Sequence, residues 1–78
     1  MIMSDAEKRQ IFLDLYSEVF DEDDNIRVCT RKITSKLISF ANKNFCDEGL
    51  AIFGSDYTGM MNTQELHALH KKLIEQNV

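Results

Sequence analysis

Apolar side chains recur at intervals of three and four residues in three separate segments of this chain, and this spacing predicts helices. No proline interrupts any of the segments. A chain of 78 residues has material for a single hydrophobic core. We therefore expect an all-α fold in which three main helices form one domain over residues 1–78.

The first predicted helix begins after Ser4. Ser4 and Glu7 have the spacing of a capping box, in which the serine hydroxyl accepts from the glutamate N–H and the glutamate side chain bonds back to the serine. The apolar stripe of this helix comprises Phe12, Leu15, Tyr16, Val19 and Phe20. The stripe stops at residues 21–25, four acids and an asparagine, which predict a turn with Asp24 or Asn25 as the next N-cap.

The second predicted helix covers about residues 26–45 and would be about 30 Å long, which is long for so small a core. Its apolar seam consists of Ile26, Cys29, Ile33, Leu37, Phe40, Ala41 and Phe45. Val28 and Ile38 lie off this seam. We therefore interpret Val28 and Ile38 as an apolar flank that contacts a partner or a second copy of the chain.

The connection over residues 46–61 contains all three glycines, Gly49, Gly54 and Gly59, so we expect the chain to turn more than once there. Its apolar run at residues 50–53 fits either a short extra helix within 47–54 or a short strand, because four residues do not distinguish the two periods. We favour the short helix.

The last predicted helix begins after Asn62, which has Glu65 as its capping-box partner. Its buried stripe is expected to comprise Leu66, Leu69, Leu73 and Ile74.

Charge is segregated along the chain. Residues 1–25 carry two cations against eight acids, residues 26–46 carry five cations and no acid, and residues 47–78 carry two cations against five acids. Exposed helix faces normally mix the two signs. We therefore interpret the five cations of the middle segment as a charged, partner-binding face: Arg27, Arg31, Lys32, Lys36 and Lys43.

Three uses of this basic face fit the sequence. It can pair with the acidic first helix or acidic turn, within one chain or across a dimer. It can dock on an acidic patch of another protein, or lie on nucleic-acid phosphates. The net charge of −4 and the pI near 5.0 oppose the nucleic-acid use, and residues 46–61 are too long for the turn of a helix-turn-helix motif.

The acidic turn does not have the pattern of a calcium site. Counting from Asp21, Ile26 and Lys32 stand where an EF-hand loop requires glycine and a bidentate glutamate. The lysine would place a cation where two oxygen ligands belong. We therefore interpret residues 21–25 as a solvated turn.

The remaining motifs do not indicate catalysis or a cofactor. Cys29, Cys46, His67 and His70 match a zinc site in number, but the cysteines lack the short paired spacing of zinc ligands. No serine lies in a G-x-S-x-G motif and no glycine run forms a phosphate loop. We expect no enzyme, no metal and no cofactor, and surface or half-buried histidines.

The longest apolar run, residues 50–53, is far shorter than the ~20 residues of a membrane span, and the N-terminus lacks the apolar core of a signal peptide. We expect a soluble, cytoplasmic protein. A core of this size supplies only about 3–5 kcal/mol, which favours self-association. Our hypothesis is a small non-enzymatic regulator or adaptor that binds another protein and forms a homodimer; the alternative is a nucleic-acid-binding transcriptional regulator that uses the basic second helix.

Overall fold

The computed structural model describes residues 3–27, 31–57 and 59–76. In this part of the chain every regular element is helical, as the apolar spacing predicts, and the only β pairing is one isolated bridge. The elements are α1 (Asp5–Val19), α2 (Arg31–Asn44), α3 (Cys46–Phe53), the 3₁₀ turn η1 (Gly54–Asp56) and α4 (Thr63–Gln76).

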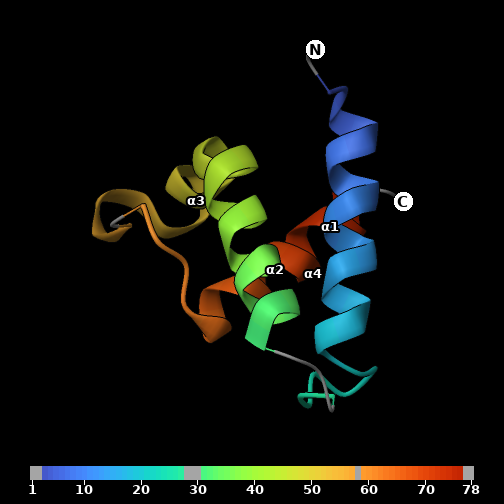
Figure 1. The fold of residues 1–78 in the computed structure, drawn as a ribbon. Coiled ribbons are helices and arrows are strands. Elements are labelled where there is room, and N and C mark those ends of the chain that lie inside the picture. Colours follow the sequence, from blue (N-terminus) through green and yellow to red (C-terminus); the bar gives the residue numbers. More distant parts are fainter. Residues whose placement is uncertain (1–2, 28–30, 58, 77–78) are drawn as a thin grey trace.

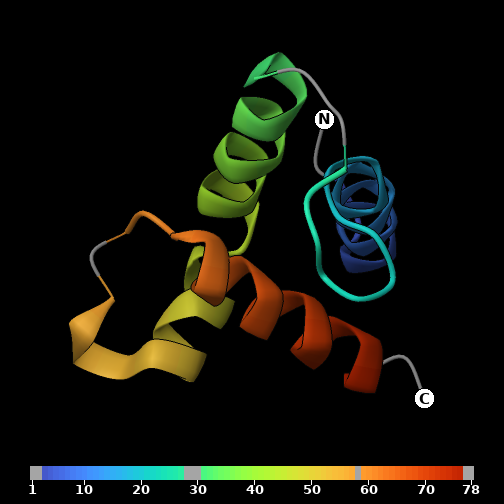
Figure 2. The same cartoon turned by 90° about the horizontal axis from the view of Figure 1, so that it is seen from below.

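The helices are arranged around the α1–α2 pair. α1 and α2 lie side by side and run in opposite directions (Figure 1). α4 crosses beneath them, and the short α3 packs against it (Figure 2). No helix in the described residues combines the length and the apolar character that crossing a bilayer requires.

Both predicted capping sites are confirmed. The Ser4 hydroxyl accepts from the Glu7 N–H at 3.2 Å. In a complete box the Glu7 carboxylate would accept from the Ser4 backbone N–H, whereas here it accepts from the Ser4 hydroxyl at 3.3 Å. At the start of α4 the box is complete, because Asn62 accepts from the Glu65 N–H at 2.9 Å and Glu65 accepts from the Asn62 N–H at 3.0 Å. Side chains three residues apart thus determine where α1 and α4 begin.

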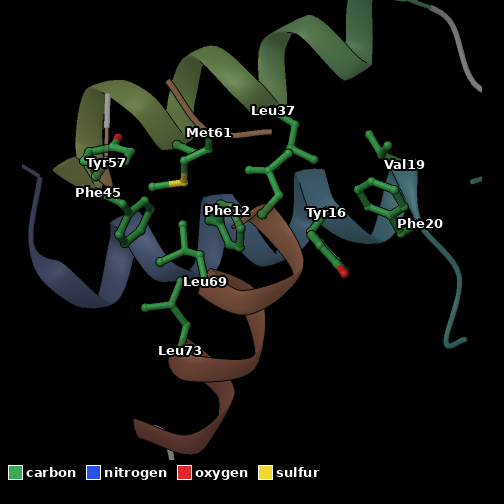
Figure 3. Packing of buried hydrophobic residues seen from close by; sticks show 12 residues of the cluster. Phe12, Tyr16, Val19, Phe20, Leu37, Phe45, Tyr57, Met61, Leu69 and Leu73 are labelled. Atoms are coloured by element: carbon green, nitrogen blue, oxygen red, sulfur yellow. The ribbon is translucent and has the colours of Figure 1, made fainter. Parts of the chain in front are cut away.

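The core forms where α1, α2 and α4 meet, with contributions from the segment between α3 and α4 (Figure 3). The predicted stripe of α1 is confirmed. One residue of the predicted α4 stripe is wrong: Ile74 is 47% exposed, because it lies about 140° around the helix from the fully buried Leu69. The buried residues of the core are Phe12, Tyr16, Val19, Phe20, Leu37, Ala41, Phe45, Tyr57, Met61, Leu66, Leu69 and Leu73.

The predicted start of the second helix is wrong. Ile26 forms a bridge with Phe20, and the Arg27 N–H donates to the Val19 carbonyl at 2.8 Å, so neither residue belongs to a helix. Ile26 is 71% exposed and is not part of the core. Asp24 has a positive φ of 62°, so it lies within the turn and is not an N-cap; the seam residue Cys29 lies outside the described residues.

The short helix predicted in the connection is confirmed as α3, and the alternative strand is absent from the described residues. Gly54 and Gly59 have positive φ values and turn the chain, as expected. Gly49 has a different role, because it is buried inside α3. A Cβ atom at Gly49 would lie 2.8 Å from Cζ of Tyr57, so the ring packs directly on the glycine backbone.

We predict that Gly49→Ala destabilises the fold. Alanine improves helix propensity by about 1 kcal/mol, but overpacking against a fixed ring costs about 1–3 kcal/mol. Urea denaturation of the variant should therefore give a lower free energy of unfolding. In a Tyr57→Ala background the same substitution should become neutral or stabilising; an equal loss in both backgrounds would refute the contact as the cause.

Candidate interaction surface

The described residues of α2 present four cations and no acid to solvent. Arg31, Lys32, Lys36 and Lys43 are all exposed. At 3.6 residues per turn, the three lysines fall within an arc of about 40° and form a stripe roughly 16 Å long. The structure therefore places four of the five predicted face residues on one helix.

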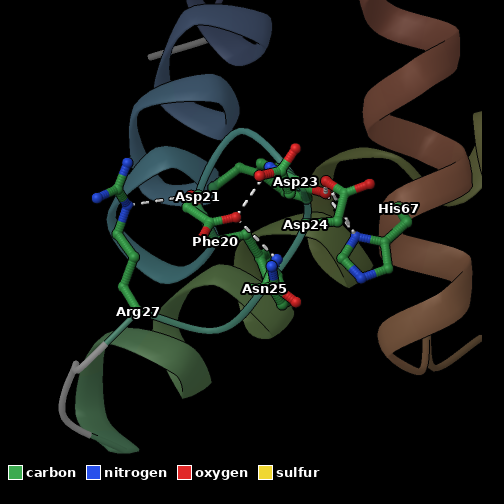
Figure 4. Close-up of polar contacts among 8 residues, drawn as sticks. Phe20, Asp21, Asp23, Asp24, Asn25, Arg27 and His67 are labelled. Atoms are coloured by element: carbon green, nitrogen blue, oxygen red, sulfur yellow. Dashed lines mark hydrogen bonds and ion pairs between the residues drawn. The ribbon is translucent and has the colours of Figure 1, made fainter.

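Arg27 lies apart from this helix. Its Nε–H donates to the Phe20 carbonyl at 3.2 Å, and its backbone N–H donates to the Val19 carbonyl. Both bonds join Arg27 to the C-terminal end of α1 (Figure 4). The prediction that Arg27 belongs to a helical face is wrong, because Arg27 precedes α2 and lies outside any helix.

The cations of α2 have no ion-pair partner among the described residues. Among the described residues, the recorded contact between a basic side chain and a carboxylate is that of His67 Nδ1 with Asp24 Oδ1, which is an ion pair only when the imidazole is protonated. Arg31 and Lys32 also occupy the first turn of α2, which holds no acid, although the positive end of the helix dipole favours acids there. In residues 3–27, 31–57 and 59–76, then, the acids of this chain do not neutralise the face through direct contact.

The predicted apolar flank is described only in part. Ile38 is partly buried and packs against the core, so only a portion of its side chain faces solvent. Val28 lies outside the described residues.

The acidic segment at residues 21–25 forms the predicted turn. The Asp21 carboxylate accepts from the N–H groups of Asp23 and Asn25, each at 2.9 Å, and the Asp21 carbonyl accepts from the Asp24 N–H at 3.1 Å. Figure 4 shows these bonds within the loop. We call residues 21–24 the acidic loop.

The Tyr16 hydroxyl fastens the acidic loop to α4. It donates to Asp24 Oδ1 at 2.6 Å. His67 Nδ1 forms a second bond to the same oxygen, at 2.5 Å. Because the hydroxyl proton is already used in the bond to Asp24, His67 Nδ1 is the donor of this second bond. Asp24 Oδ1 also lies 3.7 Å from His67 Nδ1. One phenol oxygen therefore links α1, the loop and α4.

His70 lies flat on the ring of Tyr16, with centroids 3.7 Å apart and planes inclined by 6°. Burial lowers the pKa of His70, and the nearby Asp24 carboxylate opposes this shift only in part. Burial and the hydrogen bond to Asp24 raise the pKa of Tyr16, so the phenol stays protonated as a donor. Both histidines are partly exposed, as predicted.

Metal ligands do not gather in this cluster. Among the described residues no group of three or more His, Cys, Asp or Glu side chains is placed to hold a metal ion. Of the residues weighed for zinc, Cys46 is free and exposed, and Cys29 falls outside the described ranges.

Two open hollows border the acidic loop. One of about 560 Å³ lies between Glu22 and the outer face of α4, where Lys71 and Ile74 contribute to its wall. The other, of about 220 Å³, lies beside the end of α1 and includes the rings of Tyr16 and Phe20. Glu22 and Asp24 line both, so each hollow combines carboxylates with apolar or aromatic surface.

Sequence reasoning missed the Tyr16 cluster. Tyr16 and His67 are 51 residues apart, and the helical spacing that assigns Tyr16 to the core gives no indication of its hydroxyl partners. No family model, curated protein or solved structure matches the chain.

We predict that two Tyr→Phe substitutions have different effects. Tyr16→Phe leaves Asp24 and His67 without their shared partner and should cost about 1–3 kcal/mol. Tyr57→Phe removes a buried hydroxyl that has no hydrogen-bond partner among the described residues, so it should be neutral or stabilising. Urea denaturation of both variants measures the difference, and equal losses would contradict the role of the Tyr16 bonds.

We predict that stability falls as the pH drops below about 6.5, the unfolded pKa of histidine. The pKa of His70 is lower in the folded state than in the unfolded state. The stabilisation that the neutral imidazole contributes is therefore complete above the unfolded pKa, and it is lost as the pH falls through the folded pKa. One proton gives a slope of up to ~1.4 kcal/mol per pH unit. His70→Phe, which keeps the ring stack, should flatten this dependence between pH 5 and 7 in urea titrations; an unchanged slope would exclude His70 as its source.

Proposed function

We propose that this chain is a small non-enzymatic regulator or adaptor whose basic α2 face binds an acidic surface on a protein. The observation that carries the proposal is the set of exposed cations on α2, which has no acid on the helix and no ion pair in the described residues. A partner bearing carboxylates would complement it.

The energetics favour a role in recognition over a role in stability. Exposed ion pairs contribute only about 0.2–1 kcal/mol to folding, so the cations of α2 are not needed to hold the helix in place. Complementary charges on two proteins instead speed their encounter and select the orientation of docking. The helix fixes the backbone positions from which the cations extend, which reduces the backbone entropy lost on binding.

Self-association is part of this proposal. The core contains only twelve buried hydrophobic residues among those described, and small domains commonly gain stability from oligomerisation. The partly exposed Ile38 adds apolar surface to the same helix. Cytoplasmic location is likewise part of the proposal.

We predict that converting Lys32, Lys36 and Lys43 to Gln preserves the fold and abolishes partner binding. The tagged wild type and the triple variant are compared by pull-down from nuclease-treated lysate of the native host, with circular dichroism as the test of folding. A matched control with Lys8, Lys71 and Lys72 converted to Gln removes the same charge from other helices and should keep the partner.

The nucleic-acid alternative is tested with short duplex DNA. We expect no binding at ~150 mM salt, because the chain carries a net charge of −4 and repels a polyanion. Binding that is lost in the triple variant, with a log–log salt slope of about −3 for three phosphate contacts, would overturn the proposal in favour of a nucleic-acid regulator.

A further inference from the structure

We infer that the acidic surface bound by α2 is the acidic loop of a second copy of this chain. In this symmetric dimer, Glu22 and Asp23 of each copy face the first cations of α2 in the other, and Ile26 lies at the centre. The inference rests on the proposed function, since it names the partner of the same basic face.

The acidic loop has two classes of carboxylate. Asp21 is bonded to backbone N–H groups inside the loop, and Asp24 is bonded to Tyr16. Glu22 and Asp23 are exposed, and neither carboxylate has an ion pair or hydrogen bond in the described structure. The internal bonds restrain the loop backbone, so little backbone entropy is left to lose when the two free carboxylates dock.

The start of α2 is the complementary surface. Arg31 and Lys32 occupy the first turn, where no acid is present, and Lys36 follows one turn later on the lysine stripe. Carboxylates from a second copy would neutralise these cations and also interact favourably with the positive end of the helix dipole. The interaction therefore compensates an arrangement that is unfavourable in the isolated chain.

Ile26 supplies the apolar centre of this contact. It lies in the chain between the acidic loop and α2, and it is 71% exposed although its backbone is paired with Phe20. Interfaces typically place an apolar anchor at the centre and charged residues around it. The acidic loop, Ile26 and the beginning of α2 provide both parts within one short stretch of sequence.

The arrangement of the elements suits a two-fold axis. The loop and the start of α2 lie at the same end of the molecule, the lower end in Figure 1. An axis near Ile26 would bring each loop to the other copy's helix, so the same contact forms twice. The hollow of about 220 Å³ beside Glu22 includes the rings of Tyr16 and Phe20, which suit the aliphatic stem of a lysine.

Lys43 is excluded from this contact. It lies eleven residues after Lys32, roughly 16 Å along the helix, at the opposite end of α2. This separation exceeds the Debye length of about 8 Å at physiological salt. Lys43 therefore provides a control with the same charge on the same helix.

The test is a charge-swap experiment followed by sedimentation. The loop variant carries Glu22→Lys and Asp23→Lys, and the helix variant carries Lys32→Glu and Lys36→Glu. We expect the wild type to dimerise in a salt-sensitive manner and each variant to be monomeric, because both of its contacts become repulsive. An equimolar mixture should form a heterodimer, because both contacts are then attractive again.

Three further variants complete the test. Lys43→Glu should dimerise as the wild type does, Ile26→Ser should weaken the dimer, and the neutral pair Glu22→Gln with Asp23→Asn should weaken it without risk to the fold. A wild type that sediments as a 9.0 kDa monomer at high micromolar concentration, or a mixture of swapped variants that stays monomeric, would overturn the inference. If the wild type is monomeric but captures a protein that the triple Lys→Gln variant does not capture, protein binding by the α2 face stands. In that case the self-association included in the proposed function is wrong, and the partner is a different protein.

Discussion

The fold depends on the environment of Tyr16. Its ring lies in the core beside Phe12, Phe20 and His70, and its hydroxyl reaches the surface end of the same site, where Asp24 and His67 bond to it. A phenol suits this position, because its body is apolar and its tip is polar. The acidic loop, α1 and α4 are joined there.

This junction divides the acids of the loop by function. Asp21 accepts from two backbone N–H groups of the exposed loop, and Asp24 accepts from the part-buried Tyr16 hydroxyl, whose loss of a partner costs about 1–3 kcal/mol. Glu22 and Asp23 have no such task. A run of four acids that looks uniform in the sequence therefore contains two residues that stabilise the turn and two that remain available to a partner.

The parts of the fold that depend on nearby residues could be predicted from the sequence. The stripe of α1 and the capping pairs Ser4–Glu7 and Asn62–Glu65 involve residues three or four positions apart. The start of α2 could not be predicted in this way. Ile26 continues the helical spacing of apolar residues, but its backbone pairs with Phe20 instead.

The candidate site was predictable to a similar extent. The sequence shows that the middle segment has five cations and no acid. Four of these five cations lie on α2. The bond between Tyr16 and His67 joins residues 51 positions apart, so no local pattern reveals it. The sequence places Arg27 among the cations of the face, but its bond to the Phe20 carbonyl depends on the loop that folds back beside α1.

Net charge is a poor guide to what this molecule binds. The total of −4 describes its repulsion of polyanions at long range, but salt screens that field within about 8 Å. α2, with its 14 residues, is about 21 Å long, so its two ends act as separate charged sites. In the proposed dimer, the groups that matter are therefore those at one end of the molecule: cations at the start of α2, carboxylates in the adjoining loop and the exposed Ile26. A surface with both signs beside an apolar residue can complement a copy of itself, whereas a phosphate backbone would meet the carboxylates of the loop along with the cations of the helix.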